Sequence, residues 1–600
     1  MIEKQSPVER LHLLWIALFS AGILFALRVI NLQILMHSYY KEISDRNRTQ
    51  IIPQTAPRGR IFTRDGTAVA TSKPSFSMVY FPQEGQNLKS LEKMARALSG
   101  SLNLSIEEFR TALYKSVKGL PVKLAEGISD KNMFLISEMR TIYSGINIIT
   151  ESRRFYPFGA FLSHMTGYIG KMEARDWEKY SKERDYTMDS RIGKSGLEKA
   201  FEKSLKGKDG GVYLEVDSKG RLMSILESRR WQPGSDIFLT VDFRIQKAAE
   251  DGLAGSLTGK GAVVAVDPRS GAILAFASTP DYDPNMYVLG AAGPDAERLK
   301  QAPEFNCAIQ GTYAPGSAFK IVVAAAALEL NKIKPEETFF CPGFYDAGSR
   351  IFRCWEKKGH GNMNFLNGIA HSCDVYFYNL GLKTGAMNIE KFSKMFRLGE
   401  LSNVALAGEK AGNLFGPTRR LAKMSYWFIG DTLNLSIGQG ELLATPMQLA
   451  QIASAVANRG TFWKPYFVDR VADADGNTVY KEEPEILSKV SLRPSTWDLL
   501  RDGLEKAVLE GTGRPARIAG ARVFGKTGTA QNPHGKDHAW FVAFAETDVE
   551  PSRIAVCVLV EFGEHGASSA APIAKQVIEA ALGDKNSDEW LVNSGEQKKN

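Results

Sequence analysis

The sequence predicts an α+β protein with a single N-terminal transmembrane helix, an elongated middle domain and a C-terminal domain in which a sheet is flanked by helices. Three observations predict this fold class. Residues 11–27 form an apolar run without charge. The chain has 600 residues, more than one hydrophobic core supports, so at least two domains are expected. Strand-like segments at both ends of the C-terminal half enclose a helical middle, which indicates one sheet built from distant segments.

The apolar run lies between Arg10 and Arg28. With the apolar residues just beyond Arg28, about 20 residues can cross a hydrocarbon core of roughly 30 Å if the Arg28 side chain extends toward the interface. We therefore predict a cytoplasmic tail at 1–10 and an anchor at 11–35. A cleaved signal peptide is the alternative, but the run is longer than a usual signal core and no A-x-A-like site follows it cleanly. The first ten residues carry two acidic and two basic side chains, so their charge is a weak guide to orientation.

The middle domain is expected at 36–235. Residues 57–72 contain an Asp-Gly turn between two strand-like segments and predict a hairpin, in which Arg58 and Arg60 should form salt bridges. Helical spacing dominates 83–145, residues 153–170 are aromatic and loop-like, and a glycine turn opens an amphipathic helix within 191–207. Apolar and polar residues alternate at 211–226, a pattern that predicts strands.

The C-terminal domain is expected at 236–585. A strand leading into a helix is predicted at 233–253, a buried hairpin at 261–278, mainly helices at 290–515, strands at 520–531, 538–547 and 553–562, and a last helix near 571–582. The polar segment 586–600 is expected to be a disordered tail.

The segment that carries chemistry is residues 310–330. Ser317 and Lys320 are three residues apart at the start of an apolar helical run, so both side chains face the same side of its first turn. A lysine among apolar neighbours loses proton affinity and can accept the proton of a serine hydroxyl. This pair alone is a weak signal, because S-x-x-K occurs often by chance.

Two further motifs follow in order. Ser372 and Asp374 lie in one segment, and a later strand-like segment carries Lys526, Thr527, Gly528 and Thr529. S-x-x-K followed by an S-x-[DN]-like triplet and K-T-G is the signature of penicillin-recognising serine enzymes. Three motifs in this order are much more specific than any one of them.

With these motifs, the chain resembles the class B penicillin-binding proteins from about residue 57 nearly to 590. Blocks such as RGRIFTRDG, GKSGLEKAFE, YAPGSAFK and GKTGTAQ carry the resemblance, and the SCD triplet with GHG upstream is most similar to the elongation-specific penicillin-binding protein 2. The resemblance implies a pedestal of the penicillin-binding protein dimerisation type and a β-lactamase-like transpeptidase domain. It also implies a D,D-transpeptidase, with carboxypeptidase-type serine chemistry, that is a target of β-lactams.

The resemblance also implies roles for the motif residues. Ser317 is acylated by the penultimate D-Ala of a stem peptide ending in D-Ala-D-Ala, Lys320 accepts its proton, and Ser372 passes a proton to the leaving amine. Lys526 keeps the site electropositive. The hydroxyls of Thr527 and Thr529 bind the terminal carboxylate beside Gly528, and the N–H groups of Ser317 and Thr529 form the oxyanion hole. Asp374 stands where the usual motif has Asn, and could pair with Lys320 or Lys526, or cap a helix.

A cluster of metal-ligand residues surrounds the second motif. Cys341, Cys354, His360 and Cys373 are separated by 12, 5 and 12 residues. Three thiols and an imidazole are a complete ligand set for structural Zn²⁺. A disulfide between Cys341 and Cys354 is the alternative in an oxidising compartment, and a cluster with neither remains a third possibility.

The remaining expectations concern partners and location. A net charge of +8 with 24% charged residues of both signs is weak evidence for nucleic-acid binding, and none is expected. By resemblance, the partners are the membrane, a RodA-type SEDS glycosyltransferase and MreC-like scaffold proteins, and the catalytic domain lies in the periplasm of a bacterium, held by one pass through the inner membrane. The rival functions are a catalytically silent β-lactam receptor or scaffold, and a β-lactamase, for which no Glu-bearing loop is apparent.

Overall fold

The computed structural model of the protein describes residues 7–37, 40, 49–80, 88–102, 106–107, 110–111, 122–143, 145–181, 186, 190–216, 222–289, 304–348, 350–422, 424–533, 535–547 and 552–583. The predicted disordered tail at 586–600 and the first six residues of the predicted cytoplasmic tail lie outside these ranges. The chain forms two compact units, one from residues 1–57, 73–153 and 208–232, the other from 58–72, 154–207 and 233–600. It therefore passes between the units after residues 57, 72, 153, 207 and 232, and the predicted boundary near 235 lies beside the last of these passages.

The predicted anchor is helical. Helix α1 spans Pro7–Ile30 and continues as a π-helical turn, η1 (Asn31–Leu35). In the part of the chain that the structure describes, one stretch is long and apolar enough to cross a membrane, Trp15–Leu35, with a mean hydropathy of 1.9. None of that stretch is buried inside the protein, as expected of a helix whose apolar surface faces lipid.

The first unit combines two small sheets with two helices. Strands β1 (Thr49–Gln54), β8 (Gly210–Val216) and β9 (Leu222–Arg229) form one antiparallel sheet. The later part of β3 (Ala68–Tyr80) pairs with β4 (Val122–Ile128) and with β5 (Ile146–Phe155). Helices α3 (Leu88–Leu102) and α5 (Asp130–Ile142) supply Leu98 and Ile136 to a core shared with Met78 and Tyr80.

The second unit begins with the predicted hairpin. Strand β2 (Ile61–Phe62) pairs antiparallel with the start of β3 and parallel with β10 (Asp236–Leu239). Beyond β10 lie β18 (Val468–Ala472) and β19 (Thr478–Lys481). Short elements follow the hairpin in this unit: α6 (Ser163–Thr166), β6 (Ile169–Lys171), α7 (Ala174–Tyr180), β7 (Arg191–Gly193), α8 (Gly196–Ala200) and α9 (Glu202–Leu205).

A five-stranded antiparallel sheet organises the rest of the second unit. Its order is β12-β11-β23-β22-β21, so β12 and β21 are its edges. The strands are β11 (Gly261–Val266), β12 (Ile273–Thr279), β21 (Arg522–Ala530), β22 (His538–Glu546) and β23 (Ile554–Val560). Strands from the two ends of the domain thus meet in one sheet, as predicted, with Val264 opposite Cys557.

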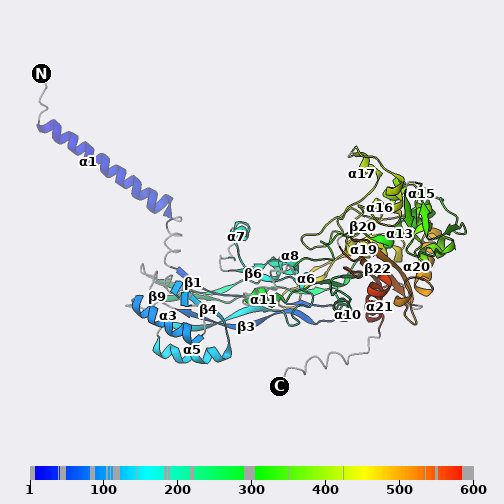
Figure 1. Cartoon of the computed structure of the whole chain (residues 1–600). Helices are drawn as coiled ribbons and strands as arrows, with labels where there is room; N and C mark the ends of the chain where they lie inside the picture. The colour runs from blue at the N-terminus through cyan, green and yellow to red at the C-terminus, as the bar shows by residue number, and fades with distance from the viewer. Residues whose placement is uncertain are drawn as a thin grey trace. The chain divides into compact units, whose positions relative to one another are not determined.

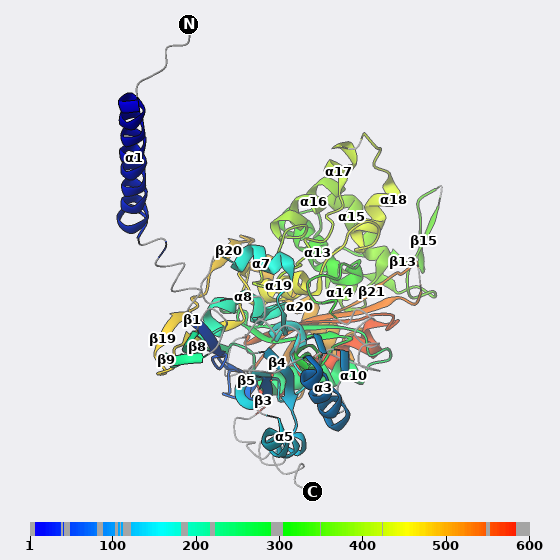
Figure 2. The same cartoon turned by 90° about the vertical axis from the view of Figure 1, so that its left-hand side faces the viewer.

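Alternate residues of this sheet enter two different cores. Val263 and Val558 pack against α10 (Phe243–Ala254) and α21 (Ala571–Leu582), whereas Val264 faces the opposite layer. That opposite layer contains α13 (Lys320–Glu329) and α19 (Pro446–Ala457). Figure 1 shows α10 and α21 on one side of β22 and α13, α15 and α16 on the other, and Figure 2 shows the same layer turned by 90°.

The elements of the helical layer include several short strands. They are α11 (Pro284–Leu289), η2 (Gly316–Phe319), β13 (Phe339–Cys341), β14 (Phe344–Asp346), β15 (Ile351–Arg353), β16 (Gly361–Met363), α14 (Phe365–Ala370), α15 (Asp374–Thr384), α16 (Ala386–Met395), α17 (Pro417–Ala422), α18 (Ile429–Ser436), β17 (Thr461–Trp463), β20 (Ile486–Lys489), α20 (Pro494–Leu509), η3 (Arg514–Ala516) and, after β23, η4 (Gly566–Ala570).

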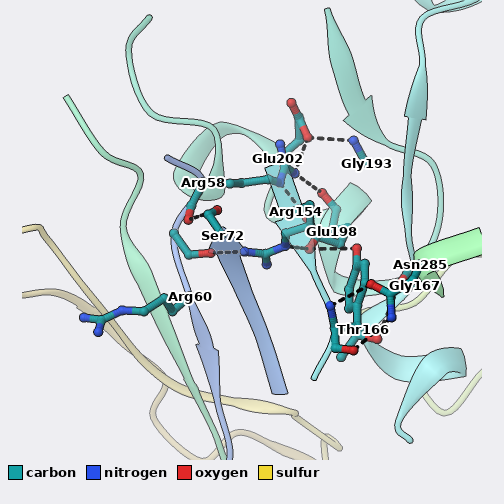
Figure 3. A network of polar contacts seen from close by, with 12 residues as sticks. Arg58, Arg60, Ser72, Arg154, Thr166, Gly167, Gly193, Glu198, Glu202 and Asn285 are labelled. Carbon is teal, nitrogen blue, oxygen red and sulfur yellow. Dashed lines mark hydrogen bonds and ion pairs between the residues drawn. The ribbon is translucent and has the colours of Figure 1, made fainter. Parts of the chain in front are cut away.

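Arg58 and Glu198 form the centre of a buried polar network in the second unit (Figure 3). The Arg58 Nε donates to Glu198 at 2.6 Å and its Nη2 to Glu202 at 2.5 Å, and the Arg154 Nε donates to the other oxygen of Glu198 at 2.6 Å. Arg154 also donates to the Gly59 carbonyl at 2.6 Å. The salt bridges predicted for Arg58 and Arg60 are thus confirmed, but their partners lie outside the hairpin. Arg58 pairs with Glu198 and Glu202 of α8 and α9, about 140 residues away, and Arg60 pairs with Asp236.

Three expectations about local structure were incomplete. The helix predicted within 191–207 is interrupted, because Phe201 has φ −109 and ψ 26 between α8 and α9. Residues 146–155 form strand β5 although the sequence there has polar and charged residues on both faces. The region 290–515 contains short paired strands as well as helices, where β-branched and aromatic residues pack at the rim of the helical layer.

Candidate active site

Ser317 lies at the junction of the helical layer and the sheet. It belongs to the 3₁₀ turn η2, which leads directly into α13. Gly316 has φ +53, and a Cβ atom there would lie 2.5 Å from the Thr529 carbonyl oxygen. The turn therefore approaches strand β21 closely enough that only glycine fits. Ser317 itself is half-buried, so its hydroxyl lies at the border between the core and solvent.

Lys320 occupies the first turn of α13 and is 1% exposed. Its Nζ donates to the Ser372 carbonyl at 2.9 Å, to the Ser372 Oγ at 3.3 Å and to the Asp374 Oδ1 at 2.7 Å. The amine also lies 5.1 Å from the centre of the Phe377 ring. A buried amine needs such partners for its N–H groups, and here the second motif supplies all three acceptors. The structure thus brings the first two motifs together through Lys320.

The second motif is held in one conformation by its backbone. Ser372 has φ +53, an uncommon left-handed value for a residue with a side chain, and it lies just before Cys373, the N-cap of α15. Asp374 pairs with Lys320 rather than with Lys526, and it is the first residue of α15, whose N-cap is Cys373. The second oxygen of Asp374 accepts from the Trp355 backbone N–H at 3.0 Å. Both oxygens therefore have a partner.

Lys526 lies on β21 and is fully buried. It lines a small apolar gap together with Lys320, Ile369 and Leu500. Burial, and then the nearby charge of Lys320, hold the pKa of Lys526 well below its usual range, although Asp374 opposes the shift. The role predicted for Lys526, a fixed positive charge, therefore needs qualification, because the amine gains a proton most readily when an anion is beside it.

The third motif lies on the edge strand β21. Gly528 stands opposite Trp540, and a Cβ atom there would lie 3.1 Å from the Pro315 carbonyl oxygen and 3.4 Å from the Ala318 nitrogen. The Thr527 hydroxyl is 2.7 Å from the Thr512 hydroxyl. Thr529 is half-buried, next to the turn that carries Ser317.

Three residues at the site had no signal in the sequence motifs. Thr512 bonds the Thr527 hydroxyl, the Trp355 backbone bonds Asp374, and Gln439 donates to the Thr529 carbonyl at 3.0 Å. Two of these contacts use backbone atoms. A motif of side-chain types cannot reveal such contacts, although the G-Q-G sequence at 438–440 marks a tight turn.

The four predicted metal ligands also come together. The Sγ atoms of Cys341, Cys354 and Cys373 and a ring nitrogen of His360 all lie within 4.8 Å of one another. The His360 Nδ1 is 3.7 Å from the Cys341 Sγ and 3.5 Å from the Cys354 Sγ. Tetrahedral Zn²⁺ with ordinary bond lengths separates a sulfur from a nitrogen ligand by about 3.6 Å, so the donor set fits this ion.

The cysteines of this cluster are free thiols in the structure, so the alternative disulfide between Cys341 and Cys354 is not formed there. A hydrogen bond between the sulfurs of Cys354 and Cys373 lowers the pKa of Cys354 and raises that of Cys373. A thiolate is thus favoured in the cluster, and a thiolate is the form that binds metal.

Comparison with known proteins gives consistent matches over both units. Residues 261–579 match the penicillin binding protein transpeptidase domain, and residues 53–239 match the penicillin-binding protein dimerisation domain. The chain is 31% identical to the peptidoglycan D,D-transpeptidase MrdA of Haemophilus influenzae, over 94% of this chain and 90% of that protein.

Two solved structures are similar along most of the chain. The penicillin-binding protein PBP2 of Helicobacter pylori, in a complex with MreC, has a TM-score of 0.75 and 28% identity, covering 89% of this chain and 99% of that one. A chain of a peptidoglycan synthase complex that coordinates polymerization and crosslinking has a TM-score of 0.70 and 29% identity, covering 96% of this chain and 99% of that one.

Proposed function

The chain belongs to the penicillin-binding protein 2 family of peptidoglycan D,D-transpeptidases, and from this premise we propose that Ser317 carries the acyl group when it cross-links stem peptides during cell elongation. The observation that carries the proposal is the contact of the Lys320 amine with Ser372 and Asp374, one helical turn beyond Ser317. In this proposal Lys320 is the proton acceptor, Ser372 the proton relay and Asp374 the counter-charge.

In the proposed acylation step, the Ser317 Oγ attacks the carbonyl carbon of the penultimate D-Ala, and its proton passes to Lys320. The negative charge of the tetrahedral intermediate is stabilised by the backbone N–H groups of Ser317 and Thr529, which lie on adjoining chain segments. The C–N bond then breaks. The leaving D-Ala amine takes a proton through Ser372, which already contacts the Lys320 amine.

In the second step, an amine from a neighbouring stem peptide attacks the acyl-enzyme and forms the cross-link. That amine loses a proton to the same Lys320 and Ser372 pair, and the Ser317 Oγ recovers a proton as its ester bond breaks. Thr527 and Thr529 bind the carboxylate of the first substrate beside Gly528, close to the Lys526 amine. A β-lactam carries an equivalent carboxylate and amide carbonyl, so it should acylate the same serine.

The experiment that tests this function is peptide mapping after exposure of the full chain to a labelled penicillin. We expect one adduct, on Ser317, and none in Ser317→Ala. A control in Ser372→Ala should still map the adduct to Ser317, only more slowly. An adduct on another residue overturns the assignment. A mapped adduct without cross-linking of stem peptides favours the silent receptor instead.

We propose in addition that Cys341, Cys354, His360 and Cys373 hold one structural Zn²⁺. The support is the soft donor set within 4.8 Å and its place next to the second motif, since Cys373 lies between Ser372 and Asp374. Bound Zn²⁺ would cross-link β13, the 354–360 loop and the start of α15.

The metal proposal is tested by metal analysis of protein purified without chelators and by counting thiols after denaturation. About one Zn²⁺ per chain with five titratable thiols supports it, whereas no metal and three thiols indicates a disulfide. Cys354→Ser should lose the metal and melt at a lower temperature. Cys307→Ser is the matched control, because Cys307 is equally buried but lies outside the cluster.

We also propose that the catalytic unit lies on the periplasmic side of a bacterial inner membrane, anchored by α1. The support is the substrate, which is assembled into the wall outside the cytoplasm, together with the apolar helix. Partners of the RodA type and the MreC type are proposed because a similar protein was solved with MreC and another in a peptidoglycan synthase complex. Protease protection in spheroplasts, with cleavage of the catalytic unit only from outside, tests the orientation.

A further inference from the structure

The turn that follows helix α18 touches both walls of the active site. This turn, residues 437–440, is fixed by the end of the helix, where the Gly438 and Gln439 N–H groups each donate to a carbonyl of α18 at 3.0 Å. Gly438 and Gly440 have positive φ values of 69° and 87°. The conformation therefore requires glycine on both sides of Gln439, and it points one polar side chain toward the catalytic strand.

The first contact of the turn is with the segment that carries Ser317. The Gly316 N–H donates to the Gly438 carbonyl at 2.9 Å. A Cβ atom on Gly438 would lie 2.2 Å from the Gly316 carbonyl oxygen and 2.7 Å from the Phe319 Cβ. The two backbones are thus in direct contact, and the position of η2 depends on this turn.

The second contact is with the third motif. The Gln439 Nε2 donates to the Thr529 carbonyl at 3.0 Å, and Gln439 is 8% exposed. Strand β21 is an edge, and the carbonyl and N–H of one strand residue point to the same side of the strand. By binding the Thr529 carbonyl, Gln439 holds the backbone of Thr529 next to η2, where a Cβ atom on Gly316 would lie 2.5 Å from the Thr529 carbonyl oxygen and 3.3 Å from its nitrogen.

We propose that Gln439 is a positioning residue for acyl transfer. Through Gly438 and its own amide, the turn sets the separation and direction of the two N–H groups, of Ser317 and Thr529, that stabilise the tetrahedral intermediate. The inference rests on the proposed function of these two groups, and it adds a residue that itself need not touch the reacting atoms.

The structure gives two reasons why the side-chain amide matters and not only the bulk of Gln439. The carbonyl that it binds lies against η2, because a Cβ atom on Gly316 would be 2.5 Å from the Thr529 carbonyl oxygen. Without the Gln439 donor, the backbone of Thr529 loses a contact that holds it beside η2, and a shift of that backbone moves the Thr529 N–H that faces the substrate. A donor that is misaligned loses much of its effect on a developing oxyanion.

The test compares Gln439→Met, which keeps the length but has no donor, with Gln439→Glu, which donates only when its carboxyl is protonated. The matched control is Gln451→Met, because Gln451 is also a buried glutamine whose amide donates to backbone carbonyls, those of Ser402 and Trp463, but from α19. The full chain is acylated with a labelled penicillin in stopped-flow experiments. The carbonyl stretch of the acyl-enzyme is then recorded by infrared difference spectroscopy.

We expect Gln439→Met to lower the acylation rate constant by about 10- to 100-fold, less than the loss of a direct oxyanion donor, with the affinity of the initial complex changed by less than threefold. The acyl carbonyl stretch should move to higher frequency, because its hydrogen bonds weaken. Gln439→Glu should regain rate relative to the unmodified chain as the pH falls, and Gln451→Met should match the unmodified chain in rate and spectrum.

The inference is overturned if Gln439→Met acylates within twofold of the unmodified chain, if its carbonyl stretch is unchanged, or if Gln451→Met has the same effect. A pH profile of Gln439→Glu parallel to that of the unmodified chain also overturns it. Failure of the proposed function is a different result, because it appears in the unmodified chain as an adduct that does not map to Ser317.

Discussion

Replacing Glu198 by Gln should destabilise the second unit more than any change to the neighbouring exposed ion pair. Glu198 is fully buried and accepts from Arg58, Arg154 and the Tyr156 hydroxyl. Burial alone would raise the pKa of Glu198, but the guanidinium groups of Arg154 and Arg58 outweigh it and hold that pKa below its usual range. The carboxylate is therefore ionised at neutral pH, and an amide in its place leaves buried positive charge uncompensated.

The size of the expected destabilisation follows from the burial of Glu198. Breaking a buried ion pair by removing one partner costs about 3–5 kcal/mol, and among the described contacts Arg154 would keep only neutral acceptors, such as the Gly59 carbonyl, and no carboxylate. For a unit of about 440 residues, with an unfolding entropy of about 0.9 kcal/mol/K, that free energy lowers the melting temperature by roughly 3–6 °C. Differential scanning calorimetry of the detergent-solubilised chain measures it.

The matched control is Arg60→Ala in the same hairpin. Arg60 pairs with Asp236 at 2.6 Å, but its side chain is 56% exposed, and exposed pairs contribute at most about 1 kcal/mol. Equal melting temperatures for Glu198→Gln and Arg60→Ala would refute the reasoning. So would a Glu198→Gln protein whose unfolding is indistinguishable from that of the unmodified chain.

Three further predictions concern the catalytic unit. Lys320→Ala should slow acylation by a labelled penicillin about 10²- to 10⁴-fold, and near-normal rates would contradict its role as the base. Binding of a D-Ala-D-Ala peptide should be coupled to proton uptake, because a carboxylate beside Lys526 raises the pKa of its amine, which burial has lowered. Titration calorimetry in two buffers measures the proton uptake. The same peptide with a C-terminal amide should bind without proton uptake. Burial raises the pKa of Glu250 to about 7, so the free energy of unfolding should fall as the pH rises from about 4.5 to 7. In denaturant unfolding, Glu250→Gln should remove that pH dependence and be more stable than the unmodified chain by about 3 kcal/mol at pH 7.5. An unchanged pH dependence in Glu250→Gln would contradict this prediction.

Local patterns in the sequence predicted the main elements of the C-terminal domain. The strands at both of its ends, the hairpin at 261–278 and the last helix all have strong period-two or helical patterns, because each is buried on defined faces. Strand β5 was missed because it has no buried face that alternates with an exposed one along its whole length. Its strand conformation depends on pairing with β3, a contact that local pattern cannot contain.

The candidate site could be predicted for a different reason. Ser317, Lys320, Ser372 and Lys526 are side-chain types at fixed spacings, and such spacings are visible in one sequence. What holds them was not visible. Gln439 donates to a backbone carbonyl, and Arg58 pairs with Glu198, which is about 140 residues away in the sequence. Neither contact can therefore be predicted from the neighbouring residues in the sequence.

The position of Asp374 connects the acyl-transfer site to the cysteine cluster. One oxygen of its carboxylate binds the Lys320 amine and the other binds the Trp355 N–H, so the carboxylate plane is fixed by two groups from different elements. Trp355 directly follows Cys354, and Cys373 directly precedes Asp374. A shift of Cys354 or Cys373 therefore moves Trp355 or Asp374, and with it the carboxylate that binds the Lys320 amine. For this reason the loss of the proposed Zn²⁺ should slow acylation as well as lower the melting temperature, although none of its ligands needs to touch substrate.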